Sequence, residues 1–265
     1  MIEITGHTKL YCIVADPILQ VKTPQNMNKL MAERGVDGKL VPAQVRPADL
    51  QAFMTAMRGI QNLGGLIVTV PHKTRIVSMC DEVTPAAAAV GAVNVIRRAS
   101  DGRLIGDILD GKGFVAGLRS KGIEPRGQSA FLAGAGGAAN AIAFALAEAG
   151  VSRLTIYNRT PAKVQDMIAR IARIYPNVSM QAGTDSPAGY DLVINATSLG
   201  MEPSDPMPLV VEHLTADQTV AEIIMKPELT PLLAAAQKKG CRIHYGLPML
   251  QCQLGLMADF MGIGK

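Results

Sequence analysis

The chain has no tryptophan, and its 265 residues include only five tyrosines, five phenylalanines and four cysteines. Aliphatic side chains and methionine must therefore form most of the packed interior. No two cysteines form a CxxC pair, and we expect them to be reduced and often buried. Cys241 and His244 are spaced like metal ligands, but no second pair accompanies them. The sequence therefore predicts no metal site and favours a strand at this place.

Long apolar runs and dense basic runs are also missing. No segment approaches twenty uninterrupted apolar residues, and the first residues do not resemble a signal peptide, so we expect a cytoplasmic protein that is not embedded in a membrane. The net charge of +4 is spread along the chain without interleaved aromatic residues, which gives nucleic-acid binding little support. This small positive surplus suits a basic cofactor pocket and an anionic substrate.

Short apolar runs alternate with helical patterns in the first part of the chain, which implies a parallel sheet with helices on its faces. The expected elements are, in order, a strand at 10–15, a helix at 24–34 capped by Thr23 and ended by Gly35, a strand at 38–41, a helix at 47–57, a strand at 65–70, a helix at 73–89, and a hairpin with strands at 93–97 and 103–106.

A second series of strands and helices begins near residue 129, so we expect two domains with a boundary near 110–113. The expected elements are strands at 129–133, 153–157, 191–195, 219–224 and 242–245, and helices at 138–149, 230–239 and 249–260, the first of these ending at Gly150.

A glycine-rich turn links the first strand and helix of this second series. Glycines permit a tight turn and let backbone N–H groups approach a pyrophosphate at a helix N-terminus. The motif alone fits a helix-packing turn equally well, but its place between a strand, a helix and a second strand favours dinucleotide binding. The residues of the turn are Gly134, Ala135, Gly136, Gly137 and Ala138.

The segment after the next strand indicates which dinucleotide binds. NAD-binding proteins usually place Asp or Glu there, to hold the ribose 2′-hydroxyl. This chain has Arg159 instead, with Asn158, Thr160 and Lys163 around it. A carboxylate would repel a 2′-phosphate, whereas a guanidinium can hold it in a bidentate grip. The sequence therefore predicts an NADP-dependent oxidoreductase.

A series of short segments extends from about residue 10 to the C-terminus. They are Asp16-Pro17-Ile18, Lys22-Thr23-Pro24, Val68-Thr69-Val70-Pro71-His72-Lys73, Gly91-Ala92-Val93-Asn94, Gly106-Asp107-Ile108-Leu109-Asp110-Gly111, the glycine-rich turn, Asn158-Arg159-Thr160, Asn195-Ala196-Thr197-Ser198-Leu199-Gly200-Met201, Thr230-Pro231-Leu232, and Gly246-Leu247-Pro248-Met249-Leu250 with Gln253. In their order and spacing these segments resemble the shikimate dehydrogenase family.

The resemblance implies an α/β fold with two domains. A substrate domain with a mostly parallel sheet would comprise residues 1–109, completed by the C-terminal helix in 246–265. A Rossmann NADP-binding domain would comprise 110–245, with the active site in the cleft between the two. The reaction implied is reversible hydride transfer between NADPH and the ketone of 3-dehydroshikimate, which yields shikimate.

The resemblance also assigns roles to residues. Lys73 and Asp110 match the catalytic pair that handles the hydroxyl proton; alone, Lys73 fits a solvated lysine after a turn. Substrate contacts are implied for Thr23, Thr69, Asn94 and Gln253, although core-capping or helix-surface roles fit these residues too. Cofactor contacts are implied for Asn195, Thr197, Ser198, Met201 and Gly246, where local hydrogen bonding is the ordinary alternative.

The departures from the family pattern cluster in the expected substrate pocket. Family residues with hydrogen-bonding side chains are replaced by Val21, Ile67, Ile108, Leu109 and Met225. Each lost partner of a buried polar ligand group costs about 1–3 kcal/mol. Lys22 or Gln20 could supply a new carboxylate contact.

These departures leave three hypotheses open. The first is a divergent monomeric or homodimeric enzyme for shikimate or a similar anionic cyclic hydroxy-carboxylate. The second is a dehydrogenase for a different, less polar alcohol. The third is a non-catalytic NADPH-binding regulator, against which the retained Lys73 and Asp110 argue.

Overall fold

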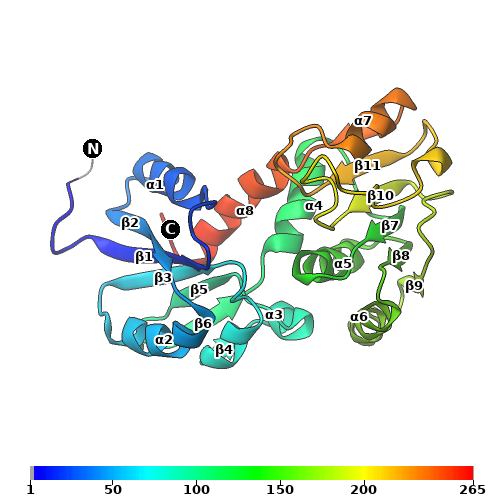
Figure 1. Ribbon diagram of the computed structural model, residues 1–265. Helices are drawn as coiled ribbons and strands as arrows, with labels where there is room; N and C mark the ends of the chain where they lie inside the picture. Colours follow the sequence, from blue (N-terminus) through cyan, green and yellow to red (C-terminus); the bar gives the residue numbers. More distant parts are fainter. Residues whose placement is uncertain (1–2, 265) are drawn as a thin grey trace. The chain divides into compact units, whose positions relative to one another are not determined.

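We describe residues 3–264 of the chain from a computed structural model (Figure 1). The chain forms two compact units. Unit 1 comprises the described residues up to Leu109 together with those from Leu254 onward, and unit 2 comprises Asp110–Gln253. The last helix, α8 (Leu247–Phe260), contributes residues to both units.

Unit 1 is built on a mixed six-stranded sheet in the order β2-β1-β3-β5-β6-β4. Strand β1 is apolar and almost wholly buried because it pairs in parallel with a strand on each side. The hairpin β5–β6 is antiparallel, as the sequence predicts. The strands are β1 (Lys9–Ala15), β2 (Gly38–Gln44), β3 (Leu63–Val68), β4 (Glu82–Val83), β5 (Val95–Arg98) and β6 (Leu104–Asp107).

The helices of unit 1 bury methionine and leucine side chains in place of aromatic ones. Met27 and Met31 of α1 are fully buried, as is Leu50 of α2, and Met54 nearly so. These helices are α1 (Thr23–Glu33), the short 3-10 turn η1 (Pro47–Asp49) that leads into α2 (Leu50–Gly59), the 3-10 turn η2 (Arg75–Met79) and α3 (Pro85–Val90).

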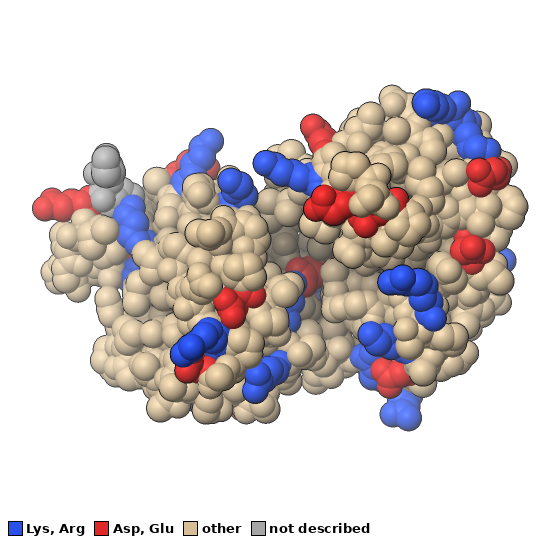
Figure 2. Space-filling model, in the orientation of Figure 1, with Lys and Arg blue, Asp and Glu red and all other residues tan. Residues whose placement is uncertain are grey.

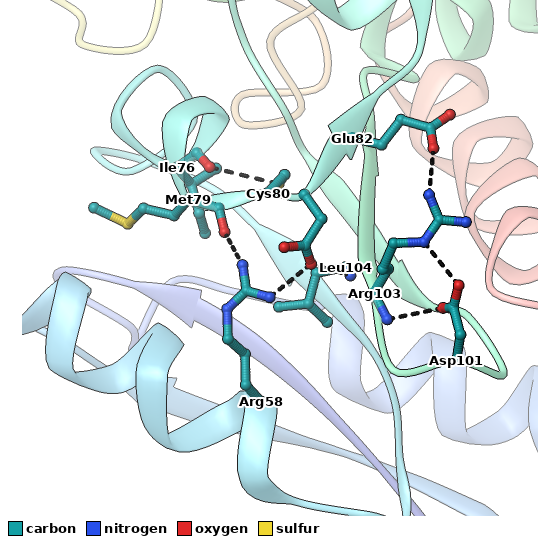
Figure 3. Close-up of polar contacts among 9 residues, drawn as sticks. Arg58, Ile76, Met79, Cys80, Glu82, Asp101, Arg103 and Leu104 are labelled. Carbon is teal, nitrogen blue, oxygen red and sulfur yellow. Dashed lines mark hydrogen bonds and ion pairs between the residues drawn. The ribbon is translucent and has the colours of Figure 1, made fainter.

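The expected helix at 73–89 is wrong. In its place the chain forms η2, strand β4 and α3, because side chains from distant segments hold residues 79–82 (Figure 3). The Arg58 guanidinium donates to the carbonyl oxygen of Met79 at 2.7 Å and to the carboxylate of Asp81 at 2.6 Å. The Arg103 guanidinium forms an ion pair with Glu82 at 3.2 Å. These contacts favour an extended chain at β4.

Helices α3 and α1 begin in different ways. Thr84 caps α3 by accepting a hydrogen bond from the Ala87 N–H at 3.2 Å, and Pro85 occupies the first turn. Thr23, expected to cap α1, is instead its first residue, because the backbone of Lys22 is already near-helical and no side chain caps the helix.

Unit 2 contains an all-parallel six-stranded sheet in the order β12-β11-β10-β7-β8-β9. The strand order reverses between β7 and β10, as in doubly wound folds. The sequence did not predict α6 or the exposed edge strand β9. The strands are β7 (Ser129–Ala133), β8 (Arg153–Tyr157), β9 (Ser179–Ala182), β10 (Leu192–Asn195), β11 (Thr219–Glu222) and β12 (Arg242–His244); the helices are α4 (Asp110–Ser120), α5 (Gly137–Ala149), α6 (Pro161–Ile174), the 3-10 turn η3 (Val211–His213) and α7 (Pro231–Lys238).

Glycines let α4 approach its neighbours closely. A Cβ atom on Gly111 would lie 1.9 Å from the Ala141 carbonyl oxygen of α5. A Cβ atom on Gly113 would lie 2.8 Å from the Cβ atom of Gln253, and one on Gly117 would lie 2.9 Å from the Met249 nitrogen. Helix α4 is therefore packed at backbone distance against α5 on one side and the first half of α8 on the other.

No helix in residues 3–264 is long and apolar enough to cross a membrane. On the face in Figure 2, basic and acidic side chains are mixed over much of the surface. Several basic side chains gather over the region where Figure 1 draws α6, whose sequence contains Lys163, Arg170 and Arg173 but only one acidic residue, Asp166.

Candidate active site

The carboxyl ends of the strands of unit 2 meet at one edge of its sheet. Asn195 ends β10, and its register partners are Ala133 at the end of β7 and Glu222 at the end of β11. Ala133 is in turn paired with Tyr157 at the end of β8. The loops that follow these strands therefore leave the sheet side by side, next to the reversal of strand order where open α/β sheets bind ligands.

The glycine-rich turn follows β7 at this edge. Gly134 has φ +122°, and a Cβ atom there would lie 2.8 Å from the Ala196 carbonyl oxygen, so the position requires glycine. Gly136 and Gly137 are exposed, and a Cβ atom on either would meet no atom within 4 Å. Ala135 is buried and Ala138 half-buried. No side chain caps the N-terminus of α5, so its first backbone groups are open to an anion.

The basic segment lies directly beside the glycine-rich turn, because the Gly134 N–H donates to the Tyr157 carbonyl oxygen at 2.7 Å. Asn158 follows Tyr157 and donates to the Thr160 carbonyl oxygen at 3.4 Å. Arg159, Thr160 and Lys163 are exposed, with Lys163 in the first turn of α6. The structure thus brings both parts of the expected dinucleotide site to the same edge.

The loop after β10 is held by the side chain of Asn195, which is fully buried. Its Oδ1 accepts from the backbone N–H of Thr197 at 3.1 Å and from the Thr197 hydroxyl at 2.7 Å. Its Nδ2 donates to the Leu199 carbonyl oxygen and to the Glu222 carboxylate, both at 3.0 Å. Ser198 and Met201, by contrast, are exposed. Asn195 therefore shapes the loop, and Ser198 and Met201 are the side chains that the loop presents.

Glu222 is a buried carboxylate that the sequence interpretation missed. Burial raises the pKa of its carboxyl, and hydrogen bonds from Asn195, the Ile223 and Ile224 backbone and Thr230 oppose that rise. The sequence signal was present, since an acidic residue at the end of an apolar strand needs hydrogen-bond donors around it.

Gly246 lies after β12 and is buried. A Cβ atom there would lie 2.4 Å from the Ile224 carbonyl oxygen, so the glycine allows this loop to approach the loop after β11. Its role in the structure is therefore close packing of backbone against backbone.

Asp110 and Gln253 form a hydrogen-bonded pair within unit 2. The Gln253 Nε2 atom donates to Asp110 Oδ1 at 2.5 Å, and both residues are buried. The pair can form because Gly113, one turn further along α4, lets α8 approach. The bond fixes the orientation of the Asp110 carboxylate, and the sequence interpretation had assigned both residues to the site without pairing them.

Three of the expected site residues of unit 1 gather at the carboxyl end of β3. Asn94 accepts from the Val68 N–H at 2.8 Å through its backbone, and the Lys73 carbonyl oxygen accepts from the Val93 N–H at 2.8 Å. Thr69 directly follows Val68. The Asn94 side chain is buried, and its Oδ1 accepts from the Leu109 N–H at 2.9 Å. Thr23, at the start of α1, is half-buried.

The positions that depart from the family pattern differ in exposure. Ile67, Ile108 and Leu109 are buried, with 2–4 % of their surface exposed, whereas Val21 is half-buried and Met225 is 48 % exposed. The first three therefore belong to the apolar interior of unit 1. Within residues 3–264, no group of three or more His, Cys, Asp or Glu side chains is placed to hold a metal ion.

Comparison with known proteins decides the family. Residues 13–96 match the model of the shikimate dehydrogenase substrate binding domain, and residues 119–202 match that of shikimate / quinate 5-dehydrogenase. The shikimate dehydrogenase (NADP(+)) of Rubrobacter xylanophilus is 37% identical over 257 residues, covering 95% of this chain and 89% of that protein. The chain belongs to the shikimate dehydrogenase family.

Two solved structures with different activities are similar to this chain over nearly its whole length. Shikimate 5-dehydrogenase from Listeria monocytogenes, in complex with shikimate and NAD, is similar with a TM-score of 0.90 and 30% identity, covering 99% of this chain and 93% of that one. The 5-ketofructose reductase of Gluconobacter is similar with a TM-score of 0.89 and 30% identity, covering 97% and 94%. The predicted family and fold class are confirmed, and the chain is an oxidoreductase of the shikimate dehydrogenase type.

Proposed function

We propose that this enzyme interconverts shikimate and 3-dehydroshikimate, or a closely similar cyclic hydroxy-carboxylate, with NADP as cofactor. The hydrogen bond between Gln253 and Asp110 carries the proposal, because it holds the carboxylate of the expected catalytic pair in one orientation. The names of the curated relatives support the same reaction.

NADP is favoured over NAD by the residues beside the glycine-rich turn. Arg159 and Lys163 are exposed there, and the ribose-binding carboxylate of NAD-dependent proteins is absent from the position of Arg159. A guanidinium donates two parallel hydrogen bonds to a phosphate. The open N-terminus of α5 would hold the pyrophosphate.

Proton handling falls to Lys73 and Asp110 in this proposal. A bound nicotinamide would supply the acceptor for the hydride of the carbinol carbon. Loss of that hydride makes the hydroxyl proton acidic, and the pair removes it, so that a ketone and one proton result. Asn94 Oδ1 accepts from the Leu109 N–H, which fixes the orientation of the Asn94 amide at the carboxyl end of β3.

Val21 and Met225 stand where the family pattern has side chains with hydroxyl groups, so hydrogen-bond partners for shikimate are lost at these two positions. We therefore expect a millimolar KM for shikimate, unless Lys22 or Gln20 restores the carboxylate contact. A neutral polyhydroxy ketone is the second candidate, because the similar Gluconobacter protein is a 5-ketofructose reductase.

The test is NADP⁺ reduction, followed by absorbance, with millimolar shikimate. Quinate, NAD⁺ and the reverse reaction of 5-ketofructose with NADPH are run alongside. Saturable turnover of shikimate with NADP⁺ is expected, and Lys73→Ala should abolish turnover while NADPH affinity stays unchanged. Turnover of 5-ketofructose alone would favour the second candidate. NADPH binding without turnover of any substrate would favour a less polar alcohol or a regulatory role.

A further inference from the structure

Glu222 lies where three segments of unit 2 meet, and its carboxylate receives four hydrogen bonds. Asn195 Nδ2 donates to Oε2 at 3.0 Å, and the Thr230 hydroxyl donates to the same oxygen at 3.1 Å. The backbone N–H groups of Ile223 and Ile224 donate to Oε1 at 2.8 and 3.1 Å. The side chain is fully buried, so these donors replace the water that a carboxylate needs.

The carboxylate determines which way the Asn195 amide faces. A carboxylate oxygen only accepts, so the NH₂ group of Asn195 must face Glu222. That leaves Asn195 Oδ1 to accept from the backbone and hydroxyl of Thr197. The Thr197 hydroxyl oxygen in turn accepts from the Leu199 N–H at 3.0 Å. If the amide were reversed, its NH₂ group would face the Thr197 N–H, and both are donors.

The loop that this relay holds is adjacent to the glycine-rich turn. The Ala196 N–H donates to the Ala133 carbonyl oxygen at 2.8 Å, directly before Gly134. A Cβ atom on Gly134 would lie 3.3 Å from the Thr197 side chain. The loop therefore forms one wall of the expected dinucleotide site.

We propose that Glu222 is a positioning residue for the nicotinamide cofactor. Its carboxylate sets the orientation of the Asn195 amide, and the relay through Thr197 holds loop 196–201 in the shape that receives the cofactor. The inference rests on the proposed function, because it assumes that this edge of the sheet binds the dinucleotide.

The test compares Glu222→Gln with Thr230→Val, using NADPH fluorescence titration, steady-state kinetics and thermal unfolding. Glu222→Gln is nearly isosteric but presents an NH₂ group where Asn195 needs an acceptor. We expect the Kd for NADPH to rise at least tenfold, with kcat at saturating cofactor within threefold of wild type. Thr230→Val removes a different donor to Glu222 and the cap of α7, leaving the relay intact. It should lower Tm while the Kd stays within twofold.

An unchanged Kd in Glu222→Gln would overturn the inference, as would an equal rise in Thr230→Val, since that would indicate general destabilisation. If Glu222→Gln does not fold, Asn195→Ala takes its place, because it breaks the relay and leaves the carboxylate three donors; the same tenfold rise is expected. A wild-type chain that binds neither NADPH nor NADH would refute the proposed function itself. Wild-type binding with unaffected variants would refute the positioning role alone.

Discussion

Arg159 is the residue on which the choice of cofactor should depend. In Arg159→Asp a carboxylate would face the 2′-phosphate, so a charge-assisted bidentate contact is replaced by repulsion. Because hydrogen bonds to charged groups contribute about 1.5–3 kcal/mol, we expect kcat/KM for NADP⁺ to fall about 100-fold while the value for NAD⁺ holds or rises. Arg173→Asp, in the exposed last turn of α6, the helix that follows Arg159, is the matched control and should change neither value more than twofold. Equal losses in both variants would contradict the assignment.

Asp110 can be tested without disturbing its partner. Asp110→Asn keeps an oxygen that can accept from Gln253 Nε2, so the helix pair should remain intact while the charge is lost. If the carboxylate moves the hydroxyl proton, kcat should fall by a factor of about 100 or more. Stopped-flow kinetics measures the rate of hydride transfer, and NADPH titration measures separately whether cofactor binding has changed. A kcat within threefold of wild type would remove Asp110 from the catalytic pair.

At the scale of elements, the glycines of α4 should be intolerant of substitution. Gly111→Ala places a methyl group 1.9 Å from the Ala141 carbonyl oxygen, and a backbone atom cannot move aside as a side chain can. Overpacking of this kind costs about 1–3 kcal/mol or more in the free energy of unfolding. Gly255→Ala in α8 is the control, because a Cβ atom there meets nothing within 4 Å, and it should stabilise by up to about 1 kcal/mol. Urea unfolding measures both changes.

The buried strands could be predicted closely, because a short apolar run between glycines is typical of a buried strand. Strands β7 and β8, for example, end where the sequence predicts. The helix at 73–89 could not be judged in this way. Its pattern is helical, but the Arg58 and Arg103 side chains hold residues 79–82 from outside the segment. Polar contacts between segments distant in sequence leave no periodic signal, but Thr84 and Pro85 are a local signal of a new helix start within the expected helix.

The local motifs of the candidate site could be predicted from the sequence, as the buried strands could, but its contacts between distant segments could not. The glycine-rich turn and Arg159 are local motifs, so the sequence alone could predict both parts of the expected dinucleotide site. The bond between Asn195 and Glu222 depends on the register of β10 and β11, whose ends are 27 residues apart in the chain. Local pattern does not determine register, so the sequence leaves both a cofactor contact and local hydrogen bonding open for Asn195, and the structure shows the hydrogen bonds of its side chain within the protein.

At the scale of the whole chain, acid stability should depend on His244. Its side chain is buried at the end of β12, with its ring edge against Phe114 at a centroid distance of 6.3 Å. Burial lowers its pKa to about 4, and the positive charges of Lys121 and Arg242 add to the shift. The folded protein therefore keeps this imidazole neutral at pH values where the unfolded chain, with a pKa near 6.5, takes up a proton.

The free energy of unfolding should consequently fall as the pH decreases from about 6.5 toward 4, and the loss should level off below that. Between pH 7.5 and 4.5 the contribution amounts to about 2–3 kcal/mol. Urea unfolding at both pH values measures it: in His244→Leu the difference between the two pH values should shrink by about that amount. His7→Leu, which replaces an exposed histidine, should leave the difference unchanged. If wild type and His244→Leu lose equal stability on acidification, the acid sensitivity of the fold arises from other groups, and the buried imidazole has no part in it.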